Sequence, residues 1–389
     1  LVQINRLPAH TPLGGFRRRP LDGRWSLELF DSPDVVPATA LTGARRRAVT
    51  VEVPGNWTMQ DLGDVVDVPQ YTNVRMPFDG PPPRLPDRNP TGVYRRTLAV
   101  PAAWRRDRVV LGVDGAESTH AVYVNGSFAG YGTGSRLPSE YDITELVTSG
   151  DNEVAIVVTR FGAHSYIEDQ DQWWMAGLHR PVWIEARPRV HLADLPVDVA
   201  FDPDTGTGQV ALEAQVRFAD EPEPGWTVRA RLTDPAGRPV GEPVDVVVPH
   251  AHAMPYVFEG FVTHARWDLR RARPWSAERP ERYTVTVELV DRRGRVRQTE
   301  SVKVGVRSVE VRDRQLLVNG RPVWIFGVNR HDHHPDRGKA VTVADIRDDL
   351  VAMRRLNISA IRTSHYPNRD EFYDLCDELG FYVVDEANI

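Results

Sequence analysis

The chain has 389 residues, of which 41% are hydrophobic and 26% charged, with a formal net charge of −6 and a pI of about 6.1. This length exceeds one ordinary hydrophobic core, so two or three domains are expected. Because the chain has no long basic run, its composition argues against nucleic acid or an anionic membrane as a partner and leaves small neutral molecules open.

Two residue types are scarce. Lys303 and Lys339 are the only lysines among 48 basic residues, which we interpret as a high-GC coding bias rather than a phosphate-binding surface. Cys376 is the only cysteine, which excludes an internal disulfide, and its helix-like surroundings favour a small buried hydrophobe over a nucleophile. No signal-peptide pattern opens the chain and no apolar run reaches membrane-spanning length, so a cytoplasmic location is expected.

Residues 1–187 are predicted to form one β-domain of the jelly-roll type. Short β-runs alternate here with Gly, Pro, Asn and Asp clusters, which is typical of an antiparallel sandwich. Asn125-Gly126 is the strongest hairpin signal. The expected strands are Trp25–Phe30, Val93–Val100, Arg108–Val113, His120–Val124, Glu153–Thr159 and Val182–Glu185.

Residues 188–305 are predicted to form a second, immunoglobulin-like β-sandwich. Functional residue types are sparse in it, so we interpret it as a spacer, with Arg270–Glu281 as an exposed loop. The expected strands are Val210–Phe218, Trp226–Leu232, Val244–Val248, Tyr256–Val262 and Tyr283–Val290.

Residues 306–389 alternate strands with helices, which predicts parallel βα units of a TIM barrel. Three βα strands are too few to close such a barrel, so we expect an incomplete domain with an exposed strand edge and exposed apolar faces. The first helix should begin with a capping box at Thr342. The second should end at Gly380 in the left-handed conformation. The expected elements are strands Val323–Asn329, Ser359–Arg362 and Phe381–Asp385 and helices Thr342–Arg355 and Asp370–Leu379.

Histidines follow two of the predicted barrel strands. Strand ends on one barrel face converge, so His331 and His365 are expected to line one pocket. Alternation along an extended segment points His331 and His333 the same way and His334 the opposite way, which disfavours a three-histidine zinc site. Structural histidines, a metal cluster and imidazoles that hydrogen-bond a polyhydroxyl substrate all remain open.

Two loops of the first domain carry groups suited to sugar recognition. Glu168–Arg180 combines carboxylates and amides with Trp173-Trp174, and aromatic faces beside hydrogen-bonding groups bind carbohydrates. The same oxygens could hold a hard cation, or the loop could be a solvated turn with tryptophan anchors. Gln70–Pro77 is long for a connector, and Asn73 in it could present its amide to a hydroxyl, although a structural loop is the simpler interpretation.

Several long motifs occur in an order that resembles glycoside hydrolase family 2, and most closely its long bacterial β-galactosidases. The resemblance covers essentially the whole chain and is weakest in the second domain. It implies a jelly-roll sugar-binding domain, an immunoglobulin-like domain and the beginning of a TIM barrel that carries the active site. Besides the two loops, the motifs are Ile4–His10, Val53–Trp57, Asn329–Pro335, Arg362–Asn368 and Tyr382–Ile389.

The resemblance also implies roles for individual residues. Asn73 and Asp171 match positions that hold the galactosyl hydroxyls, and Asp171 also matches a sodium ligand. His331 and His365 match the pair that binds the substrate and stabilises the transition state. Arg362 lies at a matching strand end. The family's magnesium ligands are expected beyond the last residue of this chain.

The implied reaction is the retaining hydrolysis of β-galactosides such as lactose, which requires two carboxylates about 5–5.5 Å apart. The family's two catalytic glutamates are expected beyond Ile389, so this chain alone should be inactive. Asp385 and Glu386 are adjacent on one strand end, where alternation separates their side chains. Asn152-Glu153 imitates the family's acid/base motif but opens a strand of the first sandwich, and we interpret it as a decoy.

Three alternatives follow from the same residues. One is another family 2 exo-glycosidase, acting on β-glucuronides or β-mannosides. The second is a non-catalytic carbohydrate-binding fragment built from the two sandwiches. The third is a metal-dependent hydrolase using His331, His333 and His334. A homo-oligomer is left open for the full-length form.

Overall fold

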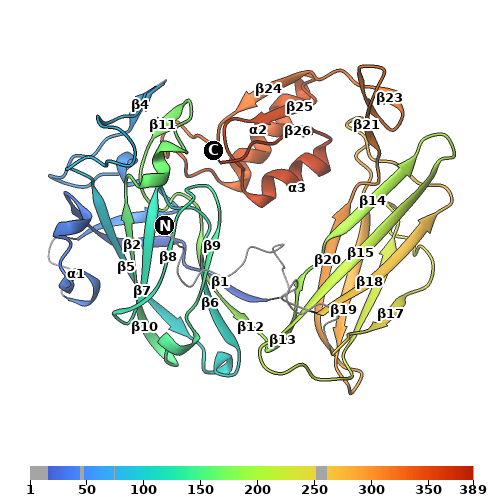
Figure 1. Cartoon of the computed structure of the whole chain (residues 1–389), viewed down its shortest axis with the longest axis horizontal. Coiled ribbons are helices and arrows are strands. Elements are labelled where there is room, and N and C mark those ends of the chain that lie inside the picture. Colours follow the sequence, from blue (N-terminus) through green and yellow to red (C-terminus); the bar gives the residue numbers. More distant parts are fainter. Residues whose placement is uncertain (1–15, 44–47, 74, 251–260, 389) are drawn as a thin grey trace.

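The computed structural model describes residues 16–43, 48–73, 75–250 and 261–388. The Ile4–His10 motif and most of the predicted strand Tyr256–Val262 lie outside these residues. Figure 1 shows two β-sandwiches on opposite sides of the molecule, with the βα segment between them at the top of the view. The predicted fold class, two sandwiches followed by the beginning of a barrel, is confirmed.

The first sandwich packs a six-stranded antiparallel sheet, in the order β3-β2-β5-β10-β7-β8, against a four-stranded sheet in the order β1-β12-β6-β9. The predicted hairpin at Asn125-Gly126 joins β7 to β8, and both residues have positive φ, at 51° and 80°. The strands are β1 (Arg17–Pro20), β2 (Gly23–Phe30), β3 (Val49–Val53), β5 (Thr91–Val100), β6 (Arg108–Val113), β7 (Thr119–Val124), β8 (Ser127–Gly132), β9 (Ser139–Asp142), β10 (Gly150–Thr159) and β12 (Val182–Arg187).

Two further strands lie apart from these sheets and pair only with each other: β4 (Gln70–Thr72) and β11 (Gln172–Trp174). Each strand covers three residues of a segment predicted to be a loop, and the other described residues of both segments lie in neither a helix nor a named strand. Short helical turns complete the domain: η1 (Pro33–Val35), α1 (Thr39–Thr42), η2 (Trp57–Met59), η3 (Ala102–Trp104), η4 (Thr144–Leu146) and η5 (Ala163–Tyr166).

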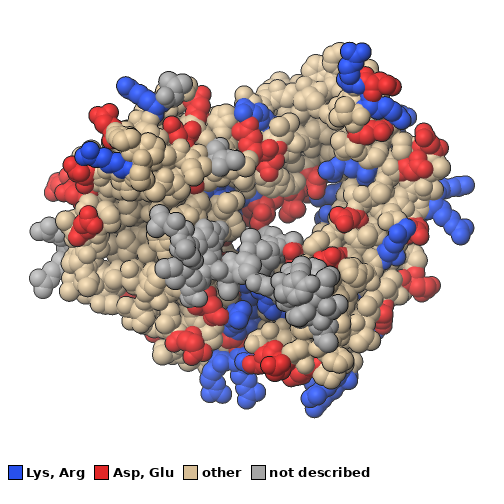
Figure 2. Space-filling model, in the orientation of Figure 1, with Lys and Arg blue, Asp and Glu red and all other residues tan. Residues whose placement is uncertain are grey.

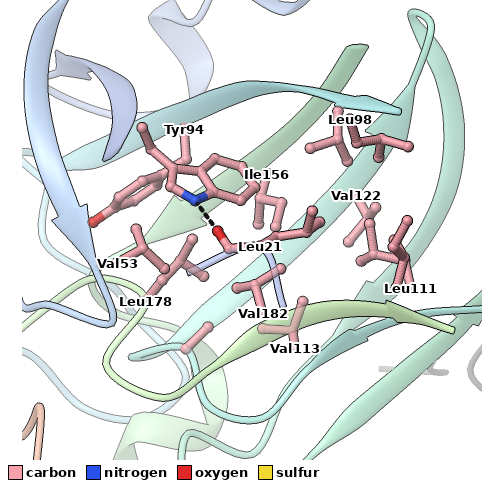
Figure 3. Packing of buried hydrophobic residues seen from close by; sticks show 14 of the residues in the cluster. Leu21, Val53, Tyr94, Leu98, Leu111, Val113, Val122, Ile156, Leu178 and Val182 are labelled. Carbon is pink, nitrogen blue, oxygen red and sulfur yellow. Dashed lines mark hydrogen bonds between the residues drawn. The ribbon is translucent and has the colours of Figure 1, made fainter. Parts of the chain in front are cut away.

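The core of the first sandwich lies between its two sheets, and Figure 3 shows part of it. Alternation along β2 points Trp25 and Leu27 inward, and both are almost fully buried. The indole of Trp25 donates its N–H to the carbonyl of Leu21 at 2.8 Å, which satisfies its one polar atom inside the core. Ile156 of β10 lies opposite Tyr94 of β5, and both are fully buried.

The second sandwich pairs β13, β14 and β18 with β15 in one sheet and forms the second sheet in the order β17-β16-β19-β20. The predicted loop Arg270–Glu281 is a loop, but it is not exposed throughout, because Trp275 and Ala277 are 2% and 1% exposed. The strands are β13 (Val190–Asp194), β14 (Val197–Asp202), β15 (Thr207–Phe218), β16 (Thr227–Thr233), β17 (Val244–Val247), β18 (Phe261–Leu269), β19 (Tyr283–Val290) and β20 (Val296–Val304).

The third segment opens with a small antiparallel sheet of β21 (Val309–Arg312), β22 (Gln315–Val318) and β23 (Arg321–Pro322). A parallel sheet follows, in the order β24-β25-β26, with α2 and α3 as its crossover helices. These elements are β24 (Gly327–Arg330), α2 (Val343–Arg355), β25 (Ala360–Thr363), α3 (Asp370–Leu379) and β26 (Tyr382–Val384).

The ends of both helices match the prediction. Thr342 and Asp345 form a reciprocal capping box at the start of α2, and Gly380 ends α3 with φ of 81°. Cys376 is buried in α3 as expected, and burial raises the pKa of its thiol. The predicted strand at Val323–Asn329 is wrong in its first half, because Val323–Phe326 lies outside any strand.

Each pair of these three segments is in contact. The indole of Trp275 in the second sandwich donates to the carbonyl of Asp377 in α3 at 2.9 Å. Phe16, next to β1, packs into the core of the second sandwich. On the face in Figure 2, acidic and basic side chains are interspersed rather than gathered by sign. No helix in the described part of the chain is long and apolar enough to cross a membrane.

Candidate functional site

A cavity of about 340 Å³ opens where the first sandwich meets the βα segment. One side of it is formed by residues 171–175, which we call the sandwich wall, together with Tyr71. The other side is formed by residues 331–339, the barrel wall, together with Tyr366. Its lining residues are Tyr71, Asp171, Gln172, Trp173, His331, His333, Lys339 and Tyr366.

The sandwich wall is built by the pairing of β4 with β11, which sets Trp173 opposite Tyr71. Alternation along β11 separates the two adjacent tryptophans, because Trp173 is 44% exposed at the cavity whereas Trp174 is 4% exposed. The rings of Tyr71 and Trp173 lie 5.5 Å apart between centroids. Trp173 is therefore exposed at the cavity, whereas Trp174 is a core anchor.

Asp171 and Asn73 both contact the hydroxyl group of Tyr71. The Tyr71 hydroxyl donates to Oδ1 of Asp171 at 2.5 Å, and the side chain of Asn73 also hydrogen-bonds this hydroxyl. The Asp171 carboxylate raises the pKa of Tyr71, because it accepts a hydrogen bond from the neutral phenol and repels the phenolate. Asp171 and Asn73 are both exposed, and Asp171 lines the cavity directly.

The two predicted histidines lie together on the barrel side, where His331 lines the cavity and His365 stands beside His331 without being one of the lining residues. His331 follows β24 and His365 follows β25, and their rings meet edge to face with 5.5 Å between centroids. Burial lowers the pKa of His331, and the neighbouring His365 adds to this effect. A neutral imidazole can donate one hydrogen bond and accept another, as a hydroxyl partner requires.

Two adjacent carboxylates at the end of β26 point to different partners, as alternation predicts. Glu386 Oε2 lies 3.0 Å from Nδ1 of His365, and its other oxygen pairs with Arg362. Asp385 instead accepts hydrogen bonds from the hydroxyls of Thr363 and Tyr373 at 2.9 and 2.8 Å. Nη2 of Arg362 also lies 3.3 Å from Nδ1 of His365, so Arg362 contacts His365 both directly and through Glu386.

The Asn152-Glu153 pair lies elsewhere. Both residues belong to β10 of the first sandwich, where Glu153 forms an ion pair with Arg95 of β5. Asn152 accepts a hydrogen bond from the backbone N–H of Thr148 at 2.8 Å and donates back to its carbonyl at the same distance. These contacts stabilise a turn.

Sequence reasoning missed a buried charged cluster behind the cavity. Nζ of Lys339 donates to Oε1 of Glu117 at 2.9 Å, and both residues are at least 96% buried, at 4% and 2% exposure. Burial and the Arg136 guanidinium lower the pKa of Lys339 to about 7, whereas Glu117 opposes this shift. The only signal in the sequence was the rarity of lysine in this chain.

His179 is buried in the same cluster, and its pKa lies well below the usual value. Burial is the main cause, and the guanidinium groups of Arg136 and Arg180 add to it. The imidazole is therefore neutral, and its Nε2 lies 2.8 Å from the carbonyl of Ser135.

The residues present do not by themselves fit the metal ions that the sequence resemblance implies. In the described part of the chain, no group of three or more His, Cys, Asp or Glu side chains is arranged to hold a metal. Asp171 offers one carboxylate, and its Oδ1 already accepts from Tyr71. Hard cations take six or more oxygen ligands, which Asp171 alone does not supply.

The chain is similar over its whole length to known glycosidases. It is 38% identical over 412 residues to a β-galactosidase of Aeromonas hydrophila and 36% identical over 415 residues to a β-galactosidase of Erwinia tasmaniensis. Each match covers 100% of this chain but only 39% and 38% of the relative, so the chain spans about two-fifths of their length.

Among solved structures, a β-glucuronidase of Bifidobacterium dentium in complex with coumarin-3-O-glucuronide superposes with a TM-score of 0.79. It covers 99% of this chain and 63% of its own, at 22% identity, a level that supports the fold alone.

Three family models match consecutive parts of the chain. Residues 18–188 match the sugar binding domain of glycosyl hydrolases family 2, and residues 190–307 match a further model of glycosyl hydrolases family 2. Residues 309–389 match the TIM barrel domain of the same family. The chain therefore belongs to glycosyl hydrolases family 2.

Proposed function

We propose that these residues are the N-terminal part of a β-galactosidase, which hydrolyses terminal non-reducing β-D-galactose from β-galactosides such as lactose with retention of configuration. The main support is the cavity itself, where an exposed tryptophan, a carboxylate and the rings of His331 and His333, whose pKa values are lowered by burial, converge from two domains. Aromatic faces pack on sugar C–H surfaces, while carboxylates and imidazoles bind the hydroxyls. The curated relatives named β-galactosidase support the choice of sugar.

In this proposal each visible side chain binds the sugar rather than breaking the bond. Asp171 accepts hydrogen bonds from galactosyl hydroxyls, and Asn73 presents its amide beside it. His331 and His365 hydrogen-bond the hydroxyls that carry developing charge in the oxocarbenium-like transition state. Arg362 orients His365, because it contacts the imidazole and neutralises the Glu386 carboxylate that holds it.

The two catalytic carboxylates are proposed to lie outside residues 1–389, in a longer polypeptide. The acidic groups nearest the cavity support this, because each already has a partner. Asp171 accepts from Tyr71, Glu386 pairs with Arg362 and His365, and Asp385 is held by Thr363 and Tyr373. Neither role, a proton donor or a nucleophile on the anomeric carbon, is left to them.

A β-glucuronidase is the second candidate. The solved structure that superposes on the chain carries that name. A glucuronide has a carboxylate, and Lys339 and His333 at the cavity would favour an anion. Lys339 already pairs with Glu117, however, so its charge is largely neutralised inside the protein and attracts an anionic ligand less.

Binding and hydrolysis by this chain test the proposal directly. Methyl β-D-galactoside should bind to residues 1–389, as followed by tryptophan fluorescence, and Trp173→Ala and Asp171→Asn should each weaken binding at least tenfold. Trp226→Ala is the control, since this tryptophan lies in the second sandwich. Aryl β-galactoside should stay unhydrolysed.

The longer polypeptide should hydrolyse the aryl β-galactoside, and His331→Ala and His365→Ala should lower its kcat/KM at least a hundredfold. Faster turnover of the aryl β-glucuronide would replace the proposal with the second candidate. Turnover by residues 1–389 alone would refute the placement of the catalytic carboxylates.

A further inference from the structure

The two walls of the cavity are far apart in sequence and belong to different domains. The sandwich wall lines the cavity as far as Trp173 and continues behind it to the buried Met175, and the barrel wall ends at Lys339, which lines the cavity. A sugar that touches both walls needs their spacing fixed before it binds, because ordering them on binding would cost affinity. Some group behind the cavity must therefore contact both.

Glu117 is that group. It precedes β7 and is 2% exposed, and one oxygen, Oε1, accepts two hydrogen bonds. The first comes from the backbone N–H of Met175 at 3.2 Å, in the sandwich wall. The second comes from Nζ of Lys339 at 2.9 Å, in the barrel wall. A single carboxylate oxygen thus joins the ends of both walls.

Glu117 is itself held firmly. Its N–H donates to the carbonyl of Gly177 at 3.0 Å, and the N–H of Gly177 donates back at 3.1 Å. On the barrel side, the N–H of Lys339 donates to Oδ1 of Asn56 at 2.7 Å. The barrel wall also closes on itself, since His334 and Gly338 exchange backbone hydrogen bonds at 2.7 and 2.9 Å.

The contact between Glu117 and Lys339 is an ion pair, and the Glu117 carboxylate has few other partners. The second oxygen of Glu117, Oε2, has no hydrogen-bond partner among the described residues, and Nη1 of Arg136 lies 3.7 Å from it. Buried charges need partners, so removing either member leaves an uncompensated group in the interior. Lys339 also borders the cavity, where its ammonium adds to the lowering of the pKa of His331 and His333.

We propose that Glu117 is a positioning residue of this cavity, and that its ion pair with Lys339 sets the spacing between the sandwich wall and the barrel wall. The inference rests on the proposed function only in taking the cavity as a sugar site. Both hydrogen bonds of Glu117 end on the two walls, so the expected effect is on binding geometry.

Hydrogen–deuterium exchange on residues 1–389 tests this without any ligand. In Glu117→Gln and in Lys339→Met, the amides of Met175, Gly338 and Lys339 should each exchange at least tenfold faster, whereas those of β5 and β10 stay unchanged. The important readout crosses the cavity: Glu117→Gln must loosen the barrel wall, to which Glu117 has no backbone contact. Because the two residues act as one pair, the double variant should exchange no faster than the faster single variant.

Arg187→Met is the matched control, since Arg187 is a buried cation of the same sandwich that pairs with Glu185 and Glu140 away from the cavity. Equal loosening of both walls in this variant would show a general loss of stability and overturn the proposal. So would an unchanged barrel wall in Glu117→Gln. If a single variant does not fold, the double variant decides, because it removes the Lys339 charge together with that of Glu117 and should still loosen both walls.

Titration with methyl β-D-galactoside separates the two ideas. If the parent chain binds the sugar and the exchange rates stay unchanged in the variants, the positioning role fails and the proposed function stands. If the variants loosen both walls but the parent chain binds no sugar, the proposed function fails and the positioning role stands.

Discussion

At the scale of single residues, the barrel wall depends on a glycine. Gly338 has φ of +61°, and a Cβ atom there would lie 2.5 Å from the sulfur of Met175 and 2.8 Å from Oδ1 of Asn56. The close approach of the two walls therefore needs both a left-handed backbone and the lack of a side chain. Lys339 can reach Glu117 only because its neighbour fits in this space.

Gly338→Ala should destabilise the chain by about 2–4 kcal/mol, as the sum of left-handed strain and overpacking. Gly237→Ala is the control for strain alone, because Gly237 has φ of +77° and nothing within 4 Å of its Cβ position. That change should cost about 1–2 kcal/mol. Urea denaturation of both variants measures the difference, and equal costs would show that the wall contact is not tight.

Residue pairs across domains were beyond sequence reasoning. The motifs after two strands predicted that His331 and His365 would meet, because parallel strand ends converge, and the rings are 5.5 Å apart. Glu117 and Lys339 lie 222 residues apart in different domains, and no periodicity relates them. Their contact follows from how the domains pack, which local patterns do not encode.

At the scale of elements, the features that depend on a few neighbouring residues were predicted correctly from the sequence. The range of α3 and the caps at Thr342 and Gly380 were correct, since hydrogen bonds and φ preferences act within a few residues. Val323–Phe326 was misread as a strand because an apolar run does not reveal whether a partner strand exists. Trp275 was misread as exposed because the residues that cover it include Asp377 of α3 and Tyr382 of β26, about a hundred residues later.

The strand β13 contains a histidine that ties stability to pH. His191 is buried, and its Nδ1 lies 2.8 Å from the carbonyl of Pro188. Burial lowers its pKa to about 3, and the nearby Arg187 adds to the shift, while the hydrogen bond to Pro188 opposes it. In the unfolded chain the pKa is about 6.5, so between about pH 3 and 6.5 the unfolded state binds the additional proton. Lowering the pH through this window therefore destabilises the fold.

His191→Gln should flatten this pH dependence, by up to about 1.4 kcal/mol per pH unit, when urea denaturation is compared at several values between pH 4 and 6. His264→Gln is the matched control, because His264 is an exposed histidine on β18 of the same sheet. An unchanged slope in the His191 variant would show that the imidazole is protonated in the folded chain.

At the scale of the whole molecule, the βα segment shows an apolar surface beside β24. Trp324, Ile325 and Phe326 are 80%, 48% and 65% exposed, and the two aromatic rings stack with 6.4 Å between centroids. Contiguous exposed aromatic residues commonly mark a contact surface. The expectation of exposed apolar faces in this segment is thus confirmed.

This surface should make residues 1–389 self-associate as concentration rises, and Trp324→Ser combined with Phe326→Ser should weaken association at least tenfold. Val247→Ser is the control, because Val247 is an isolated valine, 67% exposed, on β17. Sedimentation velocity over a range of concentrations provides the measurement. A parent chain that stays monomeric throughout would contradict the prediction.

The pairwise contacts among the three segments have a mechanical consequence. Phe16 joins the two sandwiches, Trp275 joins the second sandwich to α3, and Lys339 joins the barrel wall to the first sandwich. Because each of the three segments contacts the other two, no two segments can rotate about their shared contact unless another contact breaks. The second sandwich contributes no side chain to the cavity lining. Its contacts with the other two segments nevertheless limit the rotation of those segments relative to each other.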